Sequence, residues 1–173
     1  MGLYFRQLLA GRDFAAADDA AAQMANFAYA IGDEESRECV LVDPAWDVEG
    51  LLGILDGDGM RLVGALATHY HQDHVGGSLF GLHVEGLRAL LERRAVPVHV
   101  HADEAAGLRA VTGLSATDLV THRGSDTLHA IVERRADSIL RRGAQRLAQH
   151  LARVVLIEAR QPQQVAQHAQ HLP

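Results

Sequence analysis

The sequence predicts an α/β fold, because short apolar runs and segments of helical periodicity alternate along the chain. The run Leu62–Ala67 is apolar throughout, which is typical of a parallel strand buried on both faces. Two earlier strands are expected over residues 25–31 and 38–43, joined by a polar turn at 32–36. With 173 residues and 48% apolar side chains, one globular domain is the default expectation.

The remaining elements continue this alternation. Residues 48–55 are expected to form a short helix, which ends in a polar turn at 56–59. Residues 84–94 carry valine and leucine at three- and four-residue steps, which predicts another helix. A strand over 96–101 and a helix over 103–111 follow.

A cluster of metal-binding side chains comes directly after the buried strand 62–67. Within six positions of the stretch Thr-His-Tyr-His-Gln-Asp-His-Val-Gly-Gly lie His69, His71, Asp73 and His74. Imidazole nitrogens and carboxylate oxygens bind Zn²⁺ or Fe²⁺ at neutral pH. Open α/β sheets place their sites at the carboxyl ends of strands. The sequence therefore predicts a metal site on this loop.

The spacing of the four side chains suggests how they share the metal. His69 and His71 are two positions apart, so an extended segment points both rings toward one ion. Asp73 and His74 follow where the loop is expected to curl, which turns them toward a second ion about 4 Å away. The two glycines that come next allow a tight turn. A polar loop with incidental histidines is the alternative, but four such residues after a buried strand rarely coincide.

The stretch 68–77 resembles the signature of the metallo-β-lactamase superfamily. Its surroundings are similar to the branch that contains glyoxalase II-type thioester hydrolases and persulfide dioxygenases. Residues 28–31 and 38–44 are similar to the opening strands of that fold, and the resemblance covers about residues 1–128. The fold that this resemblance implies is a four-layer αββα sandwich.

The resemblance also implies a role for each residue of the cluster. By this resemblance His69 and His71 are ligands of the first metal, and Asp73 and His74 are ligands of the second. Asp43 is implied to steady the ligand loop, whereas the sequence alone fits a turn residue before the next proline equally well.

The implied reaction is hydrolysis of a thioester, such as a hydroxyacylglutathione, or of a related acyl compound. One or two Zn²⁺ ions, or Fe²⁺, would lower the pKa of a bound water toward ~7, and the metal-bound hydroxide would attack the carbonyl. Asp73 is the predicted catalytic residue, because it can accept a proton during the attack. The alternative enzyme class within the same branch is an iron-dependent persulfide dioxygenase, which acts on a thiol-derived small molecule.

The sequence departs from the family pattern after Asp126. The family completes its site with a third histidine in a Gly-His-Thr context, a bridging aspartate in a Gly-Asp context and a last histidine near the C-terminus, and none of these motifs can be found there. The resemblance then implies only the N-terminal half of the sandwich, and a non-catalytic relative with an incomplete site becomes the alternative to an enzyme. Asp126, His122 or His129 could replace a missing ligand, although structural roles are expected more often.

Three further histidines are expected to be structural. His99 and His101 repeat the His-x-His spacing on a predicted strand, and His83 stands alone. A histidine within a strand is more often a structural residue than a ligand.

The composition changes near residue 128. Residues 1–128 carry 9 arginines against 19 acidic residues, a formal charge of −10, whereas residues 129–173 carry 7 against 3, a charge of +4. The second region is rich in glutamine, and apolar residues at helical spacing predict an amphipathic helix over 130–158. We therefore treat 129–173 as a separate tail. A frame shift in the gene is one explanation, which a search of the coding DNA for a frame with a Gly-His-Thr motif tests.

The remaining composition narrows the expected partners and location. No run approaches the roughly 20 apolar residues of a membrane span, and the N-terminus lacks the pattern of a signal peptide. The single cysteine, Cys39, fits a cytoplasmic protein. The net negative charge of residues 1–128 argues against nucleic acid as a partner, so a small-molecule substrate is expected. An exposed sheet would favour a homodimer.

Overall fold

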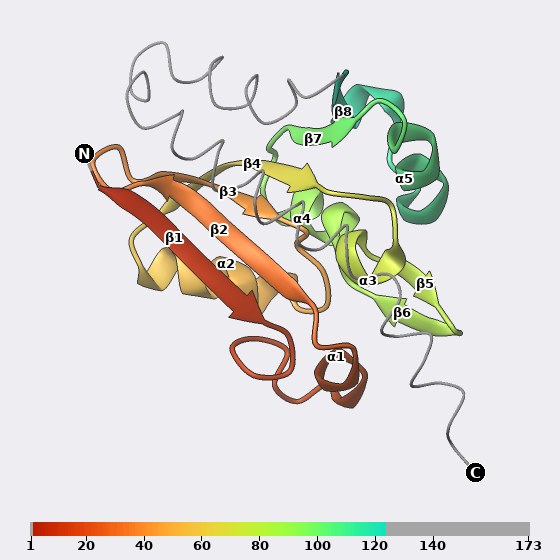
Figure 1. Ribbon diagram of the computed structural model, residues 1–173, viewed down its shortest axis with the longest axis horizontal. Helices are drawn as coiled ribbons and strands as arrows, with labels where there is room; N and C mark the ends of the chain where they lie inside the picture. The colour runs from red at the N-terminus through yellow and green to blue at the C-terminus, as the bar shows by residue number, and fades with distance from the viewer. Residues whose placement is uncertain (1, 124–173) are drawn as a thin grey trace. The chain divides into compact units, whose positions relative to one another are not determined.

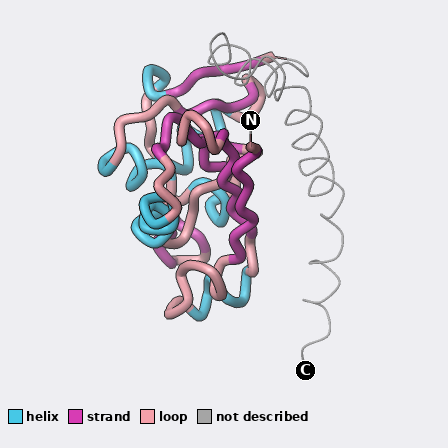
Figure 2. Tube along the Cα trace, turned by 90° about the vertical axis from the view of Figure 1, so that its left-hand side faces the viewer, coloured by secondary structure: helices cyan, strands magenta, loops and turns pink. Residues whose placement is uncertain are grey.

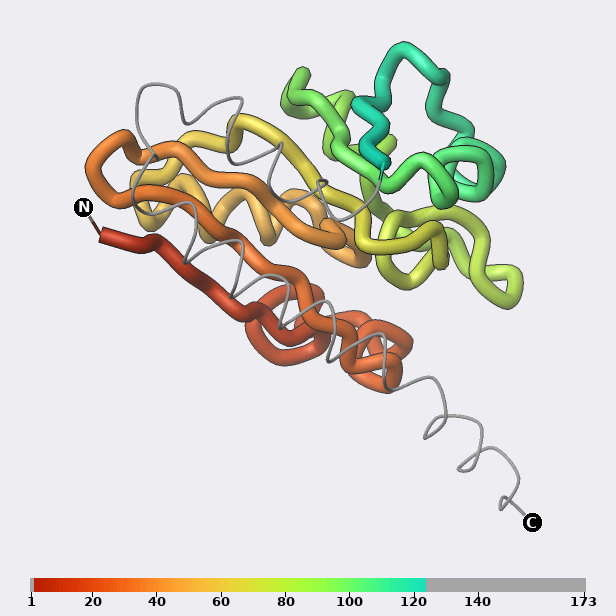
Figure 3. Tube along the Cα trace, turned by 45° about the horizontal axis from the view of Figure 1, so that its top comes forward, coloured from red at the N-terminus to blue at the C-terminus, as the bar shows by residue number. Residues whose placement is uncertain are grey.

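The computed structural model describes residues 2–123, and their main element is a mixed six-stranded sheet (Figure 1). In spatial order its strands are β1 (Leu3–Leu9), β2 (Phe27–Asp33), β3 (Glu38–Val42), β4 (Arg61–Ala67), β7 (Val98–His101) and β8 (Leu119–His122). Figure 3 shows the N-terminal strands β1 and β2 along one edge, with β7 and β8 at the other end of this order.

The pairing within the sheet changes from antiparallel to parallel at β3. β1 pairs antiparallel with β2, and β2 with β3, whereas β3–β4, β4–β7 and β7–β8 are all parallel. The predicted buried parallel strand is confirmed as β4, which has a parallel neighbour on each side. The predicted strands 25–31, 38–43 and 96–101 are confirmed as β2, β3 and β7, with ends that move by up to two residues.

Helices pack on the sheet and form the core with it. They are α1 (Asp19–Met24), α2 (Val48–Gly57), α3 (Gln72–Val75), α4 (Leu87–Arg93), α5 (Ala105–Thr112) and the 3₁₀ turn η1 (Ala116–Asp118). Figure 2 shows most of the helices on one side of the long strands, with α1 at the lower end of the strands. Leu51 of α2 and Leu90 of α4 are fully buried in one cluster with Leu41 and Ala65 of the sheet. This arrangement confirms the predicted α/β class and forms one sheet layer and one helix layer of the expected sandwich.

One predicted helix begins later than expected. The periodicity predicted a helix over 84–94, but residues 82–84 form strand β6 (Leu82–Val84), which pairs with β5 (Gly77–Leu79) in a two-stranded hairpin. α4 begins only at Leu87, because Gly86 has an extended backbone that lies against Val75 and Gly76. The apolar spacing was right for α4 itself, and Val84 is buried as a strand residue instead.

The remaining predictions of elements and of buried residues can be compared with the structure one by one. The helices expected at 48–55 and 103–111 are α2 and α5. Cys39 is buried in β3 as expected, and burial raises the pKa of its thiol to about 12. The domain boundary near 128 and the amphipathic helix at 130–158 lie outside the described residues. Within the described residues, no helix has the length and apolar character needed to cross a membrane.

Candidate metal centre

The candidate site forms where two neighbouring parallel strands end. Asp43 comes directly after β3, and the stretch from Thr68 begins directly after β4. The backbone N–H of Asp43 donates to the carbonyl of Leu66 across this pair, at 2.9 Å. The pairing therefore holds the two chain segments together at the edge where α/β sheets place their sites.

Asp43 organises the loop that follows β4. Its side chain is 1% exposed. One oxygen, Oδ1, accepts from the Thr68 backbone N–H at 2.8 Å, and Oδ2 accepts from the Thr68 hydroxyl at 2.5 Å. Oδ2 also lies 3.1 Å from Nδ1 of His74. The role in steadying the ligand loop that the resemblance implied for Asp43 is confirmed by these contacts.

The same network fixes which nitrogen of each histidine faces outward. The Thr68 hydroxyl lies 2.9 Å from Nδ1 of His69, and because its proton goes to Asp43, it accepts from that nitrogen. His74 likewise directs Nδ1 to Asp43. In both rings the lone pair then resides on Nε2, the form in which imidazole binds a metal. Burial, and then the nearby His74, lower the pKa of His69, which favours this neutral form.

α3 presents the second half of the cluster. The loop was expected to curl after His71, and it does so as a single helical turn, in which the N–H groups of His74 and Val75 donate to the His71 carbonyl at 3.0 Å. The indole N–H of Trp46 donates to the carbonyl of Asp73 at 3.0 Å. These bonds fix the backbone from which Asp73 and His74 project.

The structure brings all four predicted residues together. The ring centre of His69 lies 4.6 Å from that of His71 and 4.2 Å from that of His74. Nε2 of His74 lies 3.5 Å from Oδ2 of Asp73. His71 is exposed, whereas the side chains of Asp73 and His74 are each 14% exposed.

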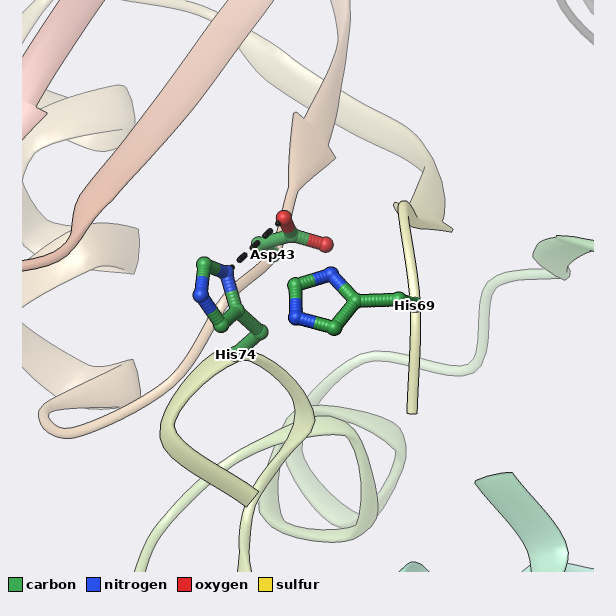
Figure 4. A group of neighbouring side chains, drawn as sticks. All are labelled: Asp43, His69 and His74. Atoms are coloured by element: carbon green, nitrogen blue, oxygen red, sulfur yellow. Dashed lines mark hydrogen bonds and ion pairs between the residues drawn. The ribbon is translucent and has the colours of Figure 1, made fainter. Parts of the chain in front are cut away.

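Among the described residues, one group of three potential donors differs from either predicted pair. Asp43, His69 and His74 have one ligand-type atom each within 4.8 Å of one another (Figure 4). Figure 4 shows the two rings side by side at the Asp43 carboxylate. Both oxygens of that carboxylate accept hydrogen bonds from Thr68, and Asp43 contacts His74 directly but His69 only through the Thr68 hydroxyl.

Two contacts of the site came without any signal in the sequence. Nδ2 of Asn26 donates to Oδ2 of Asp73 at 3.0 Å and lies 3.1 Å from Nε2 of His74. Glu104 accepts from the backbone N–H of Tyr70 at 3.1 Å through Oε2. Both partners lie more than 30 positions away along the chain, so only the fold brings them to the loop.

The other histidines of the described chain do not join this cluster. Nδ1 of His99 lies 3.0 Å from Nε2 of His122, and the two rings stack. His101 lies 3.5 Å from Asp103, and His83 is exposed on β6. The structural roles expected for His99, His101 and His83 agree with these positions. Asp126 and His129 lie outside the described residues.

Comparison with known proteins connects this site to a family. The sequence model of the metallo-β-lactamase superfamily matches residues 23–82. The chain is 42% identical to a hydroxyacylglutathione hydrolase of Synechococcus sp. over 53 residues. This aligned stretch covers 31% of this chain and 20% of that protein. The chain is 45% identical over 53 residues to the mitochondrial persulfide dioxygenase ETHE1 of Homo sapiens, covering 30% and 21%. The chain thus spans about a fifth of the length of these curated relatives.

Two solved structures also have partial similarity to this chain. ETHE1 from Myxococcus xanthus is 28% identical, with a TM-score of 0.40 over 55% of this chain and 34% of that chain. The BLEG-1 B3 metallo-β-lactamase is 24% identical, with a TM-score of 0.44 over 64% and 47%.

Proposed function

Because this chain belongs to the metallo-β-lactamase superfamily, with the matched region at residues 23–82, we propose that it is the metal-binding part of a metal-dependent thioester hydrolase. The chain spans only about a fifth of its curated relatives, so the activity of the whole protein is part of this proposal. The observation that carries it is the network in which Asp43 and Thr68 set both His69 and His74 with Nε2 as the metal-binding atom.

The proposed ligands are the four residues that the sequence singled out. His69 and His71 hold the first ion, and Asp73 and His74 hold the second. The donor set fits Zn²⁺ or Fe²⁺, since it consists of neutral imidazoles and a carboxylate. Two protein donors for each ion leave positions for a further ligand, and a catalytic zinc usually has three protein ligands.

Each residue then has a distinct part in the chemistry. A bound divalent ion supplies Lewis-acid activation of water and of the substrate carbonyl. Asp73 takes a proton from the attacking water on its carboxylate. His69 stays neutral near pH 7, because burial lowers its pKa. Asp43 fixes the ring of His74 directly and fixes the ring of His69 through the Thr68 hydroxyl.

The proposed substrate is a small-molecule thioester of the hydroxyacylglutathione type. The 42% identity with a hydroxyacylglutathione hydrolase supports it. An iron-dependent persulfide dioxygenase is the second candidate, because identity with such an enzyme is 45% over a similar stretch. A homodimer through the sheet and a cytoplasmic location stay predictions, which size-exclusion chromatography and cell fractionation test.

The test compares both activities in matched variants. The whole chain, loaded with Zn²⁺, is assayed for hydrolysis of a hydroxyacylglutathione, and loaded with Fe²⁺ for oxygen consumption with glutathione persulfide. We expect hydrolysis by the unmodified chain and by His83→Ala, a control that removes an exposed imidazole, but none by the double variant His69→Ala/His71→Ala. Equal rates in all three, or no turnover at all, would contradict the proposal. Oxygen-dependent turnover with iron alone would favour the dioxygenase.

A further inference from the structure

Asn26 reaches the candidate centre from outside the stretch 68–77. Its amide nitrogen lies 3.0 Å from Oδ2 of Asp73 and 3.1 Å from Nε2 of His74. With Nδ1 of His74 directed to Asp43, Nε2 is an acceptor, so the two protons of the Asn26 NH₂ group satisfy both neighbours. The amide therefore occupies the two lone pairs that an ion between Asp73 and His74 would use.

The position of Asn26 is fixed by its backbone. It follows Ala25, which ends α1 in the left-handed conformation with φ of 53°, and it directly precedes β2. Its carbonyl accepts from the N–H of Ala10 at 2.9 Å. The side chain thus reaches the site from a rigid junction, and only rotation of the terminal amide is needed to change what it presents.

The other end of the amide is left unsatisfied. Among the described residues, Oδ1 of Asn26 is the buried side-chain polar atom without a hydrogen-bond partner. A buried carbonyl oxygen without a partner costs about 1–3 kcal/mol. Rotation by a half turn about the last side-chain bond would bring Oδ1 to Asp73 and His74. Without a cation this would place the oxygen against a carboxylate and a lone pair, both of which repel it.

A cation between Asp73 and His74 reverses that balance. The NH₂ group can no longer donate there, whereas Oδ1 can bind the ion. We propose that Asn26 is a third protein ligand for the second ion, through Oδ1, and that its NH₂ group holds Asp73 and His74 in place before the ion binds. The inference rests on the proposed metal centre and adds to Asp73 and His74 a third donor from the described residues. Amide oxygen is an accepted ligand of divalent cations.

Variants of Asn26 test the proposal by zinc affinity, independently of any activity. Zn²⁺ binding to the whole chain is measured by competition with a chelator. Asn26→Ala is expected to weaken the second bound ion about 10- to 100-fold. Asn26→Asp keeps the shape and an oxygen donor, so it is expected to bind at least as tightly as the unmodified chain. Gln7→Ala removes an exposed amide from β1 as the matched control, and circular dichroism in chelator checks that each variant folds.

A second readout follows the amide itself. Asn26 is the single asparagine of the chain, so labelling with ¹⁵N-asparagine gives one side-chain NH₂ signal. We expect both protons to be slow to exchange with solvent in chelator, and to exchange faster when Zn²⁺ is added, because they lose Asp73 and His74.

The outcomes separate this inference from the proposed function. Zinc that binds the unmodified chain and Asn26→Ala equally well, or an NH₂ signal unchanged by zinc, would overturn the role of Asn26 and leave the metal centre standing. Asn26→Asp binding more weakly than Asn26→Ala would overturn it too. An unmodified chain that binds no zinc would overturn both.

Discussion

At the scale of single residues, the arrangement around His69 and His74 depends on one buried carboxylate. Asp43 accepts from both polar groups of Thr68 and faces His74, all within 3.1 Å. A metal-binding histidine usually donates its second N–H to such a partner, which sets the ring and its tautomer. His74 is thus positioned by Asp43 directly, and His69 is positioned by Asp43 through Thr68.

Asp43→Ala is predicted to weaken both the fold and the site. It leaves the N–H and hydroxyl of Thr68 and Nδ1–H of His74 without their acceptor, so we expect a loss of about 2–3 kcal/mol in the free energy of unfolding. Zinc affinity is expected to fall about 10- to 100-fold. Urea unfolding in chelator and zinc competition measure the two effects. Asp103→Ala, which removes an aspartate whose side chain is 88% exposed, is the control and should change neither.

At the scale of secondary-structure elements, a polar cluster joins β1 to the end of α2. Asp58 accepts from the hydroxyl of Tyr4 at 2.6 Å and from two nitrogens of Arg6 at 2.8 and 2.6 Å. The hydrogen bonds from Arg6 and Tyr4 lower the pKa of Asp58. Since β1 is an edge strand, this cluster adds a contact outside its single ladder with β2.

Asp58→Asn is predicted to destabilise the fold by about 1 kcal/mol at pH 7, a small effect because Arg6 is half exposed. The stabilisation by the ionised Asp58 is present above its unfolded pKa of about 3.9, and it is lost as the pH falls through the lower folded value. The variant should therefore lose less stability than the unmodified protein between pH 4 and 2. Thermal unfolding against pH measures this. Asp56→Asn on the same helix, whose side chain is 66% exposed, should keep the original pH dependence.

Gly76, the residue after α3, is required by a close backbone contact as well as by a tight turn. Gly76 has φ of 87°, and an added Cβ would lie 2.7 Å from backbone atoms of Gly86. Two backbones therefore cross where α3 meets the segment before α4. The sequence indicated a tight turn here, but the close neighbour 10 positions later in the chain could not be foreseen.

Gly76→Ala is predicted to cost more than about 2 kcal/mol in the free energy of unfolding, because the new methyl group meets backbone at a strained φ. Gly53→Ala is the matched control, since Gly53 lies within α2 with nothing within 4 Å of its added Cβ. That change should stabilise the protein by about 0.5–1 kcal/mol. Chemical unfolding measures the free energy of unfolding of both variants. Equal changes in that free energy would contradict the backbone crossing.

Local patterns predicted the elements that carry their own signal. The apolar run of β4 and the His-x-His-x-Asp-His stretch needed no knowledge of the fold. The predicted helix 84–94 wrongly includes Val84, the last residue of β6, because Val84 fits the helical spacing of α4 while its strand partner is Gly77 in another segment. Asn26 had no signal, since its contacts with Asp73 and His74 span 47 and 48 positions.

At the scale of the whole molecule, the proposed metal binding would be coupled to folding. The proposed donors come from the loop after β4, from α3 and from the junction before β2, so an ion bound there would link segments that are distant in the chain. Anything that binds only the folded state stabilises it.

Zinc is therefore predicted to stabilise the whole chain against unfolding. At a free concentration 100 times its Kd, one bound ion adds about 2.7 kcal/mol to the free energy of unfolding. Thermal unfolding with zinc, with zinc plus chelator, and with chelator alone measures this, and the chelator should reverse the shift completely. His69→Ala/His71→Ala should show a smaller shift than the unmodified chain.

The most direct test of the metal centre is the metal content of the purified chain by elemental mass spectrometry. The unmodified chain and His83→Ala are predicted to retain one or two equivalents of zinc or iron, and His69→Ala/His71→Ala is predicted to lose metal. A chain that retains no metal, or a double variant that retains as much as the unmodified chain, would contradict the assignment of this site.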